Sequence, residues 1–337
     1  MIYPKFLSDG SKIGVFAPSD GNSCNLDEIR LNFAVSNMQK RNFKIKVMDS
    51  CHTSNMGRST TGKKRNEEFE TLLEDKNCDL IISLSGGDFL CEMLPYINFD
   101  VIARNPKWIQ GYSDPTSLLY IITTNLDIAT IYSNNFKTFS MKKFHESLEN
   151  NIKILRGDII KQESFEKYAS TFTEYKVGDE EYVLDSDDKW GNLENKESIE
   201  FEGRIIGGCI DILIEIVGTR FDKTKEFIEK YKDDGIIWYF DNCELTLEQL
   251  IRAFFRLNEA GWLKYVNGIV FGRSLTNKSY YDITFKEAIM QSFAKLNVPI
   301  ILNVDIGHVA PQFTIINGAY AKIKNEGNKG SVEFYLK

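Results

Sequence analysis

Three absences from the sequence exclude whole classes of protein. No apolar run among the 337 residues approaches the ~20 that a membrane-spanning helix needs. The first residues, MIYPKFLSDGSKIG, lack the basic segment and apolar core of a secretion signal. Basic residues are a minority, 41 Lys and Arg against 48 Asp and Glu, and the net charge of −7 argues against neutralising nucleic-acid phosphates. We therefore expect a cytoplasmic globular protein with neither a membrane nor a nucleic acid as partner.

Cysteine and histidine are also informative by their scarcity. The six cysteines form no C-x-x-C pair and mostly lie in apolar segments, which predicts a reduced compartment and no structural zinc. Of the three histidines, His52 and His145 lie in polar or charged stretches typical of a surface. His308 follows a glycine in NVDIGHVAPQ, directly after an apolar run. If the chain has a catalytic histidine, His308 is the first choice, although an ordinary loop histidine fits the same position.

The first half of the chain alternates β-branched runs with helical patterns, which is typical of a parallel sheet flanked by helices. From about residue 140 to 200 the composition turns polar, and the chain closes with short strands separated by Gly and Asn turns, which predicts antiparallel pairing. We expect an α/β protein. It should have an N-terminal open parallel-sheet domain of the flavodoxin or Rossmann type at 1–165, a linker region at 166–200, and a C-terminal mixed α/β domain with a β-barrel-like portion at 201–337.

Two stretches place small residues between a strand and a helix. LSGGDFL puts Gly86 and Gly87 after a buried strand, where glycines free backbone N–H groups to face an anion. A tight turn alone would explain them equally well. GYSDPT puts Ser113 on the next such turn, which lifts a nucleophile above the sheet edge. The alternative is that Ser113 or Asp114 only caps the following helix.

A carboxylate that orients the histidine is expected after the apolar strand in GIIWYFDNCEL, which offers Asp241 and Glu244. Helix capping is again the simpler explanation. The stretch GRSTTGKK (57–64) nearly matches a phosphate-binding loop, but Lys64 stands where the Mg²⁺-binding hydroxyl belongs. We expect this stretch to be a solvated loop that caps the next helix.

Taken in this order, these stretches resemble the LD-carboxypeptidase family of serine peptidases (muramoyltetrapeptide carboxypeptidases), which includes the microcin C self-immunity proteins. The similar segments span nearly the whole chain: GVFAPSD, SLSGGDFLCEMLPYINFDVIARNPKWIQGYSD, GRIIGGCIDILIEIVGT, GIIWYFDNCELTLEQLIRAFFRLNEAGWL, GIVFGR and DIGHVAPQFTIINGA. The resemblance implies that Ser113 is the nucleophile and His308 the general base. Asp241 stands where the family has glutamate, with Glu244 as the alternative.

The resemblance further implies an oxyanion site made by the Asp114 N–H and by backbone around Gly86, Gly87 and Asp88. The sequence departs from the family at two places. Cys209 stands where many relatives carry Asn, and IYSNNF replaces a Gly-Pro element.

The implied activity is removal of the terminal D-alanine from cytoplasmic murein tetrapeptides in cell-wall recycling, without metal or cofactor. The implied site lies in an interdomain cleft, and family members are commonly homodimers. A peptidyl-nucleotide substrate, hydrolysed as by the immunity proteins, is one alternative, and a catalytically weak wall-peptide binding protein is another. Tyr280 and Tyr281 are aromatic side chains that could stack on a purine.

Overall fold

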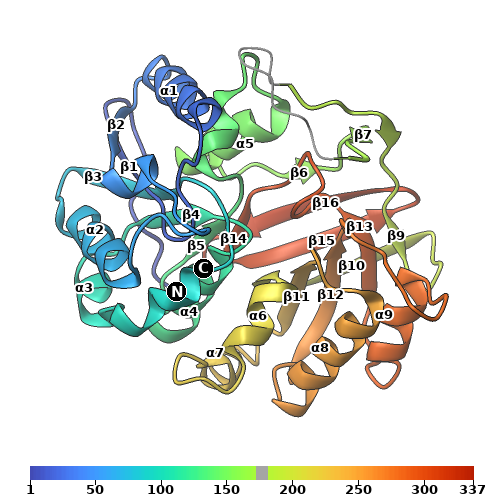
Figure 1. Cartoon of the computed structure of the whole chain (residues 1–337). Helices are drawn as coiled ribbons and strands as arrows, with labels where there is room; N and C mark the ends of the chain where they lie inside the picture. The colour runs from blue at the N-terminus through green and yellow to red at the C-terminus, as the bar shows by residue number, and fades with distance from the viewer. Residues whose placement is uncertain (172–180) are drawn as a thin grey trace.

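The computed structural model describes residues 1–171 and 181–337 and arranges them as two sheets, each flanked by helices (Figure 1). The first sheet has the strand order β14-β5-β4-β3-β1-β2. Its parallel strands are β1 (Lys12–Phe16), β2 (Lys44–Val47), β3 (Cys78–Ser83), β4 (Trp108–Gly111) and β5 (Thr130–Tyr132). The parallel sheet expected for the first half of the chain is therefore confirmed.

Helices cover both faces of this sheet. In Figure 1, α1 (Asn25–Gln39) and α5 (Glu146–Leu155) lie above it, and α2 (Gly62–Glu74), α3 (Phe99–Arg104) and α4 (Thr116–Leu126) lie below it. The double cover explains why β1 and β3 are buried along most of their length instead of on alternate residues. In this strand order the direction of winding changes between β1 and β3, and ligands of such sheets bind beside the carboxyl ends of the strands at that point.

The loop before α2 caps that helix, as expected, because the Thr61 hydroxyl accepts a hydrogen bond from the Lys64 N–H at 3.3 Å. Between β3 and α3 the chain forms two 3₁₀ turns, η2 (Leu90–Glu92) and η3 (Leu94–Tyr96). Pro95 lacks the backbone N–H that a continuous α-helix would need there. Two further 3₁₀ turns are η1 (Asp49–His52) and η4 (Phe136–Ser140).

The second sheet is mixed and has the strand order β6-β16-β15-β10-β11-β12-β13-β9. Its central parallel strands are β10 (Ser198–Cys209), β11 (Ile236–Asp241), β12 (Val266–Gly272) and β13 (Ile300–Val304). The outer strands are β15 (Tyr320–Glu326), β16 (Lys329–Tyr335), β6 (Gln162–Glu163) and β9 (Gly191–Asn192). Strands β15 and β16 pair antiparallel, as the closing Gly and Asn turns predict.

The remaining elements complete this half. Its helices are α6 (Ile210–Ile216), α7 (Thr224–Lys230), α8 (Leu247–Glu259) and α9 (Phe285–Phe293). In Figure 1 they lie together on the lower side of the second sheet. The short strands β7 (Lys167–Tyr168) and β8 (Ser186–Asp187) pair with each other apart from both large sheets.

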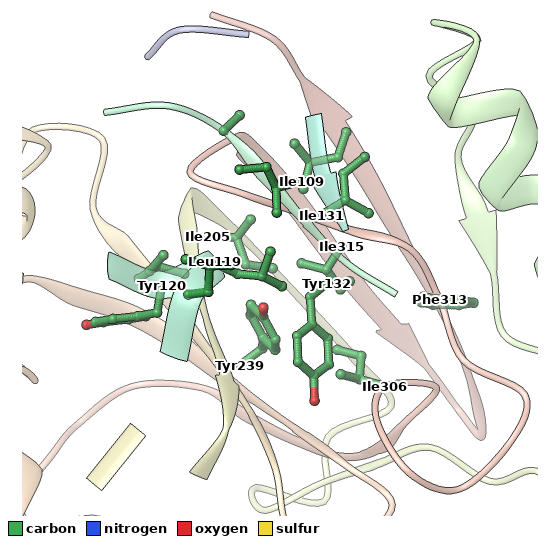
Figure 2. Close-up of a cluster of buried hydrophobic side chains, with 14 of the residues drawn as sticks. Ile109, Leu119, Tyr120, Ile131, Tyr132, Ile205, Tyr239, Ile306, Phe313 and Ile315 are labelled. Carbon is green, nitrogen blue, oxygen red and sulfur yellow. The ribbon is translucent and has the colours of Figure 1, made fainter. Parts of the chain in front are cut away.

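The two sheets share one continuous apolar core. Strand β14 (Ile315–Asn317) comes from the C-terminal part of the chain but pairs antiparallel with β5 in the first sheet, with Ile315 opposite Tyr132. Figure 2 shows Tyr132 of β5 beside Tyr239 of β11, and their ring centroids are 5.4 Å apart. At the same interface, the Tyr120 hydroxyl in α4 lies 2.7 Å from that of Thr224 in α7. The domain limits at 165 and 201 remain a prediction, because the C-terminal segment also contributes to the first sheet.

Among the described residues, no helix is long and apolar enough to cross a membrane.

Candidate active site

Ser113 lies on the sharp turn between β4, which ends at Gly111, and α4, which begins at Thr116. Its φ of +68° is unusual for a residue other than glycine. The turn is fixed by the Thr116 N–H, which donates to the Ser113 carbonyl at 2.9 Å. A Cβ on Gly111 would lie 2.8 Å from Pro115, so only glycine fits under the turn. This backbone conformation presents the Ser113 hydroxyl at the carboxyl edge of the sheet.

His308 contacts Ser113 and Asp241 at the same time. Its Nε2 lies 2.9 Å from the Ser113 Oγ, and its Nδ1 lies 2.6 Å from the Asp241 Oδ2. A carboxylate can only accept, so Nδ1 carries the proton and, in the neutral ring, Nε2 can accept from the serine hydroxyl. The His308 backbone N–H also donates to Asp241 Oδ1 at 3.2 Å. Serine, histidine and carboxylate thus form one hydrogen-bonded chain.

Two neighbours hold Asp241 in place. The Tyr132 hydroxyl donates to Asp241 Oδ2 at 2.8 Å. Gly307 has a φ of +93°, and a Cβ there would lie 2.0 Å from the Asp241 carboxyl carbon. The absence of a side chain at Gly307 therefore allows the histidine loop to approach the carboxylate. This contact shows how aspartate, one methylene shorter than glutamate, reaches the imidazole.

The electrostatics of the three groups favour a protonated imidazole. Burial alone would lower the pKa of His308, but the charge of Asp241 and its hydrogen bond outweigh burial and raise that pKa well above its ordinary 6.5. Burial, followed by the Asp241 charge, raises the pKa of Tyr132 well above 10, so its hydroxyl remains a donor. The Asp241 side chain is 0% exposed and that of His308 is 6% exposed. Their mutual attraction is therefore little weakened by water.

Glu244 does not occupy the position beside His308. It is exposed in the loop after β11, and its backbone N–H donates to Asp211 Oδ1 at 2.8 Å. Asp211, in the first turn of α6, also accepts from the N–H groups of Cys243 and Leu245, both at 3.1 Å. The structure thus brings Asp241 to the histidine and uses Asp211 to fix the loop that follows. Sequence reasoning missed both Asp211 and Tyr132.

Gly86 and Gly87 lie on the other side of Ser113. A Cβ on Gly86 would be 3.0 Å from both Cβ and Oγ of Ser113 and 3.9 Å from the Asp114 nitrogen. Gly87 has a φ of +143°, and a Cβ there would lie 2.3 Å from the Ser19 hydroxyl oxygen. Asp88 is exposed. The backbone beside Gly86 and the Asp114 N–H therefore flank the space in front of the serine hydroxyl.

Cys209 adds a thiol to this site. One ligand atom each from Cys209, Asp241 and His308 lie within 4.8 Å of one another, a spacing that could hold a metal ion. The Cys209 thiol donates to Asp211 Oδ2 at 3.3 Å, and burial raises the pKa of that thiol well above 9, so it stays protonated. A metal would also have to separate the bonded Asp241 and His308 side chains.

A cavity of about 430 Å³ lies beside the histidine loop and includes Val309 in its wall. The Arg273 guanidinium, also in its wall, bonds Asp188 and Asp305 at 2.7 Å each and the Pro311 carbonyl at 3.1 Å. Arg273 thereby fixes the segment that carries His308. The aromatic side chains lining this cavity are Tyr168 and Phe285.

Comparisons with known proteins show similarity along the whole chain. The B. subtilis (strain 168) protein named "Putative carboxypeptidase YocD" is 25% identical, with 96% of both chains covered. The crystal structure of an MccF-like protein from Bacillus anthracis superposes with a TM-score of 0.84 at 24% identity over the full length of both chains. The structure of the microcin C7 self-immunity protein MccF in complex with aspartyl sulfamoyl adenosine matches over both full lengths, with a TM-score of 0.82 and 23% identity.

Family models match both halves of the chain. Residues 13–133 match the LD-carboxypeptidase N-terminal domain, and residues 202–323 match the LD-carboxypeptidase C-terminal domain. Ser113 lies within the first range, and Asp241 and His308 lie within the second. With both domain models matched in order over most of its length, the chain belongs to the LD-carboxypeptidase family.

Proposed function

We propose that this protein is a serine carboxypeptidase that hydrolyses the amide bond before the terminal D-alanine of murein tetrapeptides. The family match supports a general carboxypeptidase function. The observation that carries the serine mechanism is the chain of hydrogen bonds at 2.9 Å and 2.6 Å from Ser113 through His308 to Asp241. These hydrogen bonds join Ser113, which follows a strand of the first sheet, to His308, which follows a strand of the second sheet. The backbone of Gly86 lies beside them.

The proposed reaction is acyl transfer in two stages. The Ser113 Oγ attacks the amide carbonyl while His308 Nε2 takes its proton, and Asp241 stabilises the imidazolium that forms. The Asp114 N–H and the backbone around Gly86 to Asp88 donate to the oxyanion, each donor contributing roughly 3 to 4 kcal/mol to the transition state. His308 then protonates the leaving amine. Water, deprotonated in turn by His308, hydrolyses the acyl-enzyme and restores Ser113.

Release of D-alanine tests this proposal directly. Purified protein is incubated with L-Ala-D-Glu-(Lys or diaminopimelate)-D-Ala, and free D-alanine is measured beside Ser113→Ala. We expect release by the wild type and a loss of at least 10³-fold in the variant, because the attacking atom is gone. Release that survives the substitution would contradict the assignment of Ser113. Labelling of the wild type by a fluorophosphonate, absent in Ser113→Ala, provides a readout that does not depend on the peptide.

A second substrate class is supported by the cavity beside His308. Its aromatic residues Tyr168 and Phe285 could contact a nucleobase, and the structurally similar MccF binds aspartyl sulfamoyl adenosine. The exposed Tyr280 and Tyr281 lie outside this wall. If the protein hydrolyses an acyl-sulfamoyl nucleoside and releases no D-alanine, the alternative function is favoured, an amidase that acts like the microcin C self-immunity proteins. If neither substrate is cleaved and no probe label appears, a wall-peptide binding protein is favoured.

We also propose a cytoplasmic homodimer, as the family resemblance implies. Sedimentation at micromolar concentration tests the oligomeric state.

A further inference from the structure

The side chain of Asp114, beside the nucleophile, has contacts that the mechanism above does not use. Asp114 is 2% exposed, and its Oδ2 accepts the Leu90 N–H at 2.8 Å and the Ser19 hydroxyl at 2.5 Å. The Ser19 oxygen in turn accepts the Phe89 N–H at 3.3 Å. One carboxylate oxygen therefore binds the end of the Gly86–Leu90 segment, both directly and through Ser19.

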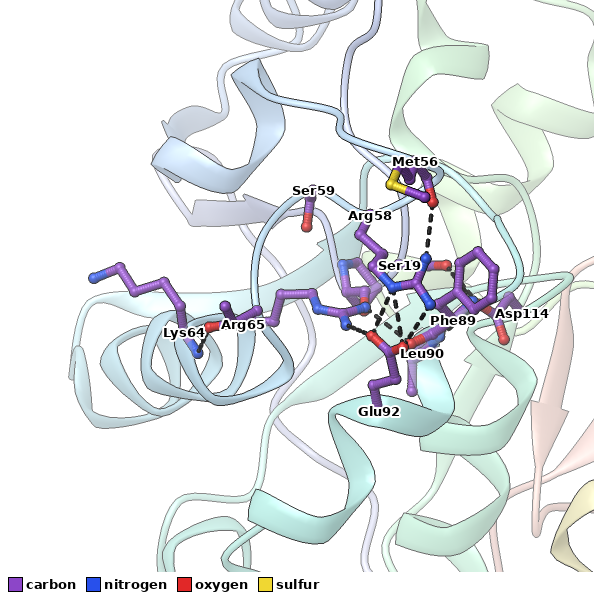
Figure 3. A network of polar contacts seen from close by, with 12 residues as sticks. Ser19, Met56, Arg58, Ser59, Lys64, Arg65, Phe89, Leu90, Glu92 and Asp114 are labelled. Atoms are coloured by element: carbon purple, nitrogen blue, oxygen red, sulfur yellow. Dashed lines mark hydrogen bonds and ion pairs between the residues drawn. The ribbon is translucent and has the colours of Figure 1, made fainter.

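The Gly86–Leu90 segment is also held from its outer side. Figure 3 shows the Arg65 side chain extending from α2 toward Phe89 and Glu92. Its guanidinium donates to the Phe89 carbonyl at 3.0 Å, to the Pro18 carbonyl at 2.8 Å and to Glu92 at 3.1 Å. The Arg65 side chain is 0% exposed. Asp114 and Arg65 thus bind the same short segment from opposite sides.

The position of this segment determines the geometry in front of Ser113. A Cβ added at Gly86 would lie 3.0 Å from the Ser113 hydroxyl oxygen, and Gly87 lies so close to Ser19 that no side chain fits between them. The Asp20 N–H donates to the Gly86 carbonyl at 3.4 Å, which ties the same segment to the loop after β1. A shift of the segment away from Asp114 would move the backbone N–H groups that face the oxyanion.

We propose that the Asp114 carboxylate is a positioning residue, which holds the Gly86–Leu90 segment at the distance from Ser113 that oxyanion stabilisation requires. The inference rests on the proposed serine mechanism and assigns Asp114 a role beyond its backbone N–H. A carboxylate suits the task because it can accept two hydrogen bonds on one oxygen, and such charge-assisted bonds are stronger than neutral ones.

The titratable neighbours of Asp114 come from several elements. Asp88 and Cys91 lie in the segment after β3, and Arg65 projects from α2. Burial and the Asp88 charge raise the pKa of Asp114, while the bonds from Ser19 and Leu90 and the Arg65 charge lower it, and the result is about 6. The carboxylate is therefore ionised in neutral solution and becomes protonated in mild acid.

The rate at which a fluorophosphonate labels Ser113 tests the inference without any peptide substrate. Asp114→Asn keeps the shape of the side chain and removes its charge. We expect this variant to be labelled at least tenfold more slowly than the wild type at pH 8, because loosely placed donors stabilise the oxyanion less. The matched control is Asp75→Asn, which removes a carboxylate paired with Lys12 at the opposite edge of the same sheet. It should be labelled at the wild-type rate.

The pH dependence separates positioning from a purely structural role. Protonation of His308 makes the wild-type rate fall tenfold per pH unit in acid, and protonation of Asp114 should steepen this fall below about pH 6. Asp114→Asn should show only the tenfold fall per pH unit that comes from His308, without the steeper fall below about pH 6. A folded Asp114→Asn that is labelled within twofold of the wild type, or that keeps the steeper slope, would overturn the inference.

A second variant keeps the test decisive if Asp114→Asn does not fold. Ser19→Ala leaves the carboxylate in place and removes one of its two bonds to the segment. We expect labelling three- to tenfold slower, and labelling at the wild-type rate would overturn the inference. If the wild type is not labelled at all, the proposed serine mechanism fails, and this inference fails with it. A labelled wild type beside an equally reactive variant overturns the inference alone.

Discussion

Gly307 shows how a single residue without a side chain can set catalytic geometry. It precedes His308 and lies where any Cβ would overlap the Asp241 carboxylate. Glycine is thus required both by the left-handed backbone and by the close approach of the two chains. The lack of a Cβ at Gly307 lets the histidine loop lie directly against the Asp241 carboxylate.

Substituting this glycine tests that explanation. We expect Gly307→Ala to lower kcat/KM for D-alanine release by at least tenfold, because it pushes the imidazole away from Asp241 or distorts the loop. Gly327→Ala is the control, since Gly327 also has positive φ, +56°, but nothing lies within 4 Å of its Cβ position. The control should keep its activity. Equal activity of both variants would show that the close approach has no catalytic value.

The acid limb of the pH profile reports the Asp241–His308 pair. The pKa of His308 lies above 6.5, so kcat/KM should rise with pH through a midpoint above that value. Asp241→Asn removes the charge that raises this pKa. We expect its midpoint at lower pH and its plateau reduced by about 10³-fold, as the imidazolium loses its partner. An unchanged midpoint would mean that another group controls the limb.

The same pair links stability to pH. Because the pKa of His308 is higher in the folded state, its pairing with Asp241 stabilises the fold fully below pH 6.5. That contribution is lost as the pH rises through the folded-state pKa. As the pH rises, the fraction of His308 in the neutral form therefore increases, while the stability contributed by its pairing with Asp241 decreases.

At the residue level, the sequence pointed to the candidate serine, histidine and carboxylate of the site. It did not point to the residues that hold them in place. Ser113, His308 and Asp241 each follow an apolar strand or a glycine, which is visible locally. Tyr132 could not be found this way, because it lies 109 residues from Asp241 and looks like an ordinary buried strand residue. Asp211 resembles any acidic residue in the first turn of a helix.

At the scale of elements, the connection between β13 and β14 is held by a buried cation. Arg273 follows β12 and neutralises Asp188 and Asp305, both with 0% exposed side chains. Burial raises the pKa of Asp188 to about 7, and the neighbouring Asp305 charge adds to this rise, while Arg273 opposes it. The guanidinium thus stabilises two acids that would otherwise repel each other beside the histidine loop.

Removing this cation should destabilise the fold strongly. We expect Arg273→Ala to lower the free energy of unfolding by about 3 to 5 kcal/mol, because it leaves two buried carboxylates without their cation. Urea unfolding at pH 8 measures the difference, and the exposed pair Lys232–Glu229 provides the control through Lys232→Ala. That variant should change stability by less than about 1 kcal/mol. A similarly small effect of Arg273→Ala would contradict the role given to it.

Predicting elements from sequence worked where the hydrophobic period was regular. The parallel strands of the first sheet and the closing hairpin follow from such patterns. The two 3₁₀ turns between Leu90 and Tyr96 are hard to predict, because a short apolar run resembles a helix until the proline interrupts its hydrogen bonds. Strand β14 has only three residues and no alternation, so only its tertiary partner β5 defines it.

At the scale of the whole molecule, the two halves complete each other. Strand β14 covers the edge of β5, and nine of the eleven residues of α4 are buried. We expect residues 1–160 expressed alone to aggregate, because an exposed strand edge and an uncovered helix remain. Co-expression with residues 161–337 should restore a soluble complex. Size-exclusion chromatography and near-ultraviolet circular dichroism would show the difference, and a monomeric, cooperatively melting fragment would contradict it.

The course of the chain after β13 has a consequence for protein synthesis. The histidine loop runs from the second sheet to β14 in the first, and His308 is 195 residues beyond Ser113. A ribosome therefore translates Ser113 and the parallel strands β1 to β5 and β10 to β13 before His308 and β14 emerge. A chain that stops before the histidine loop carries Ser113 without the imidazole that contacts it.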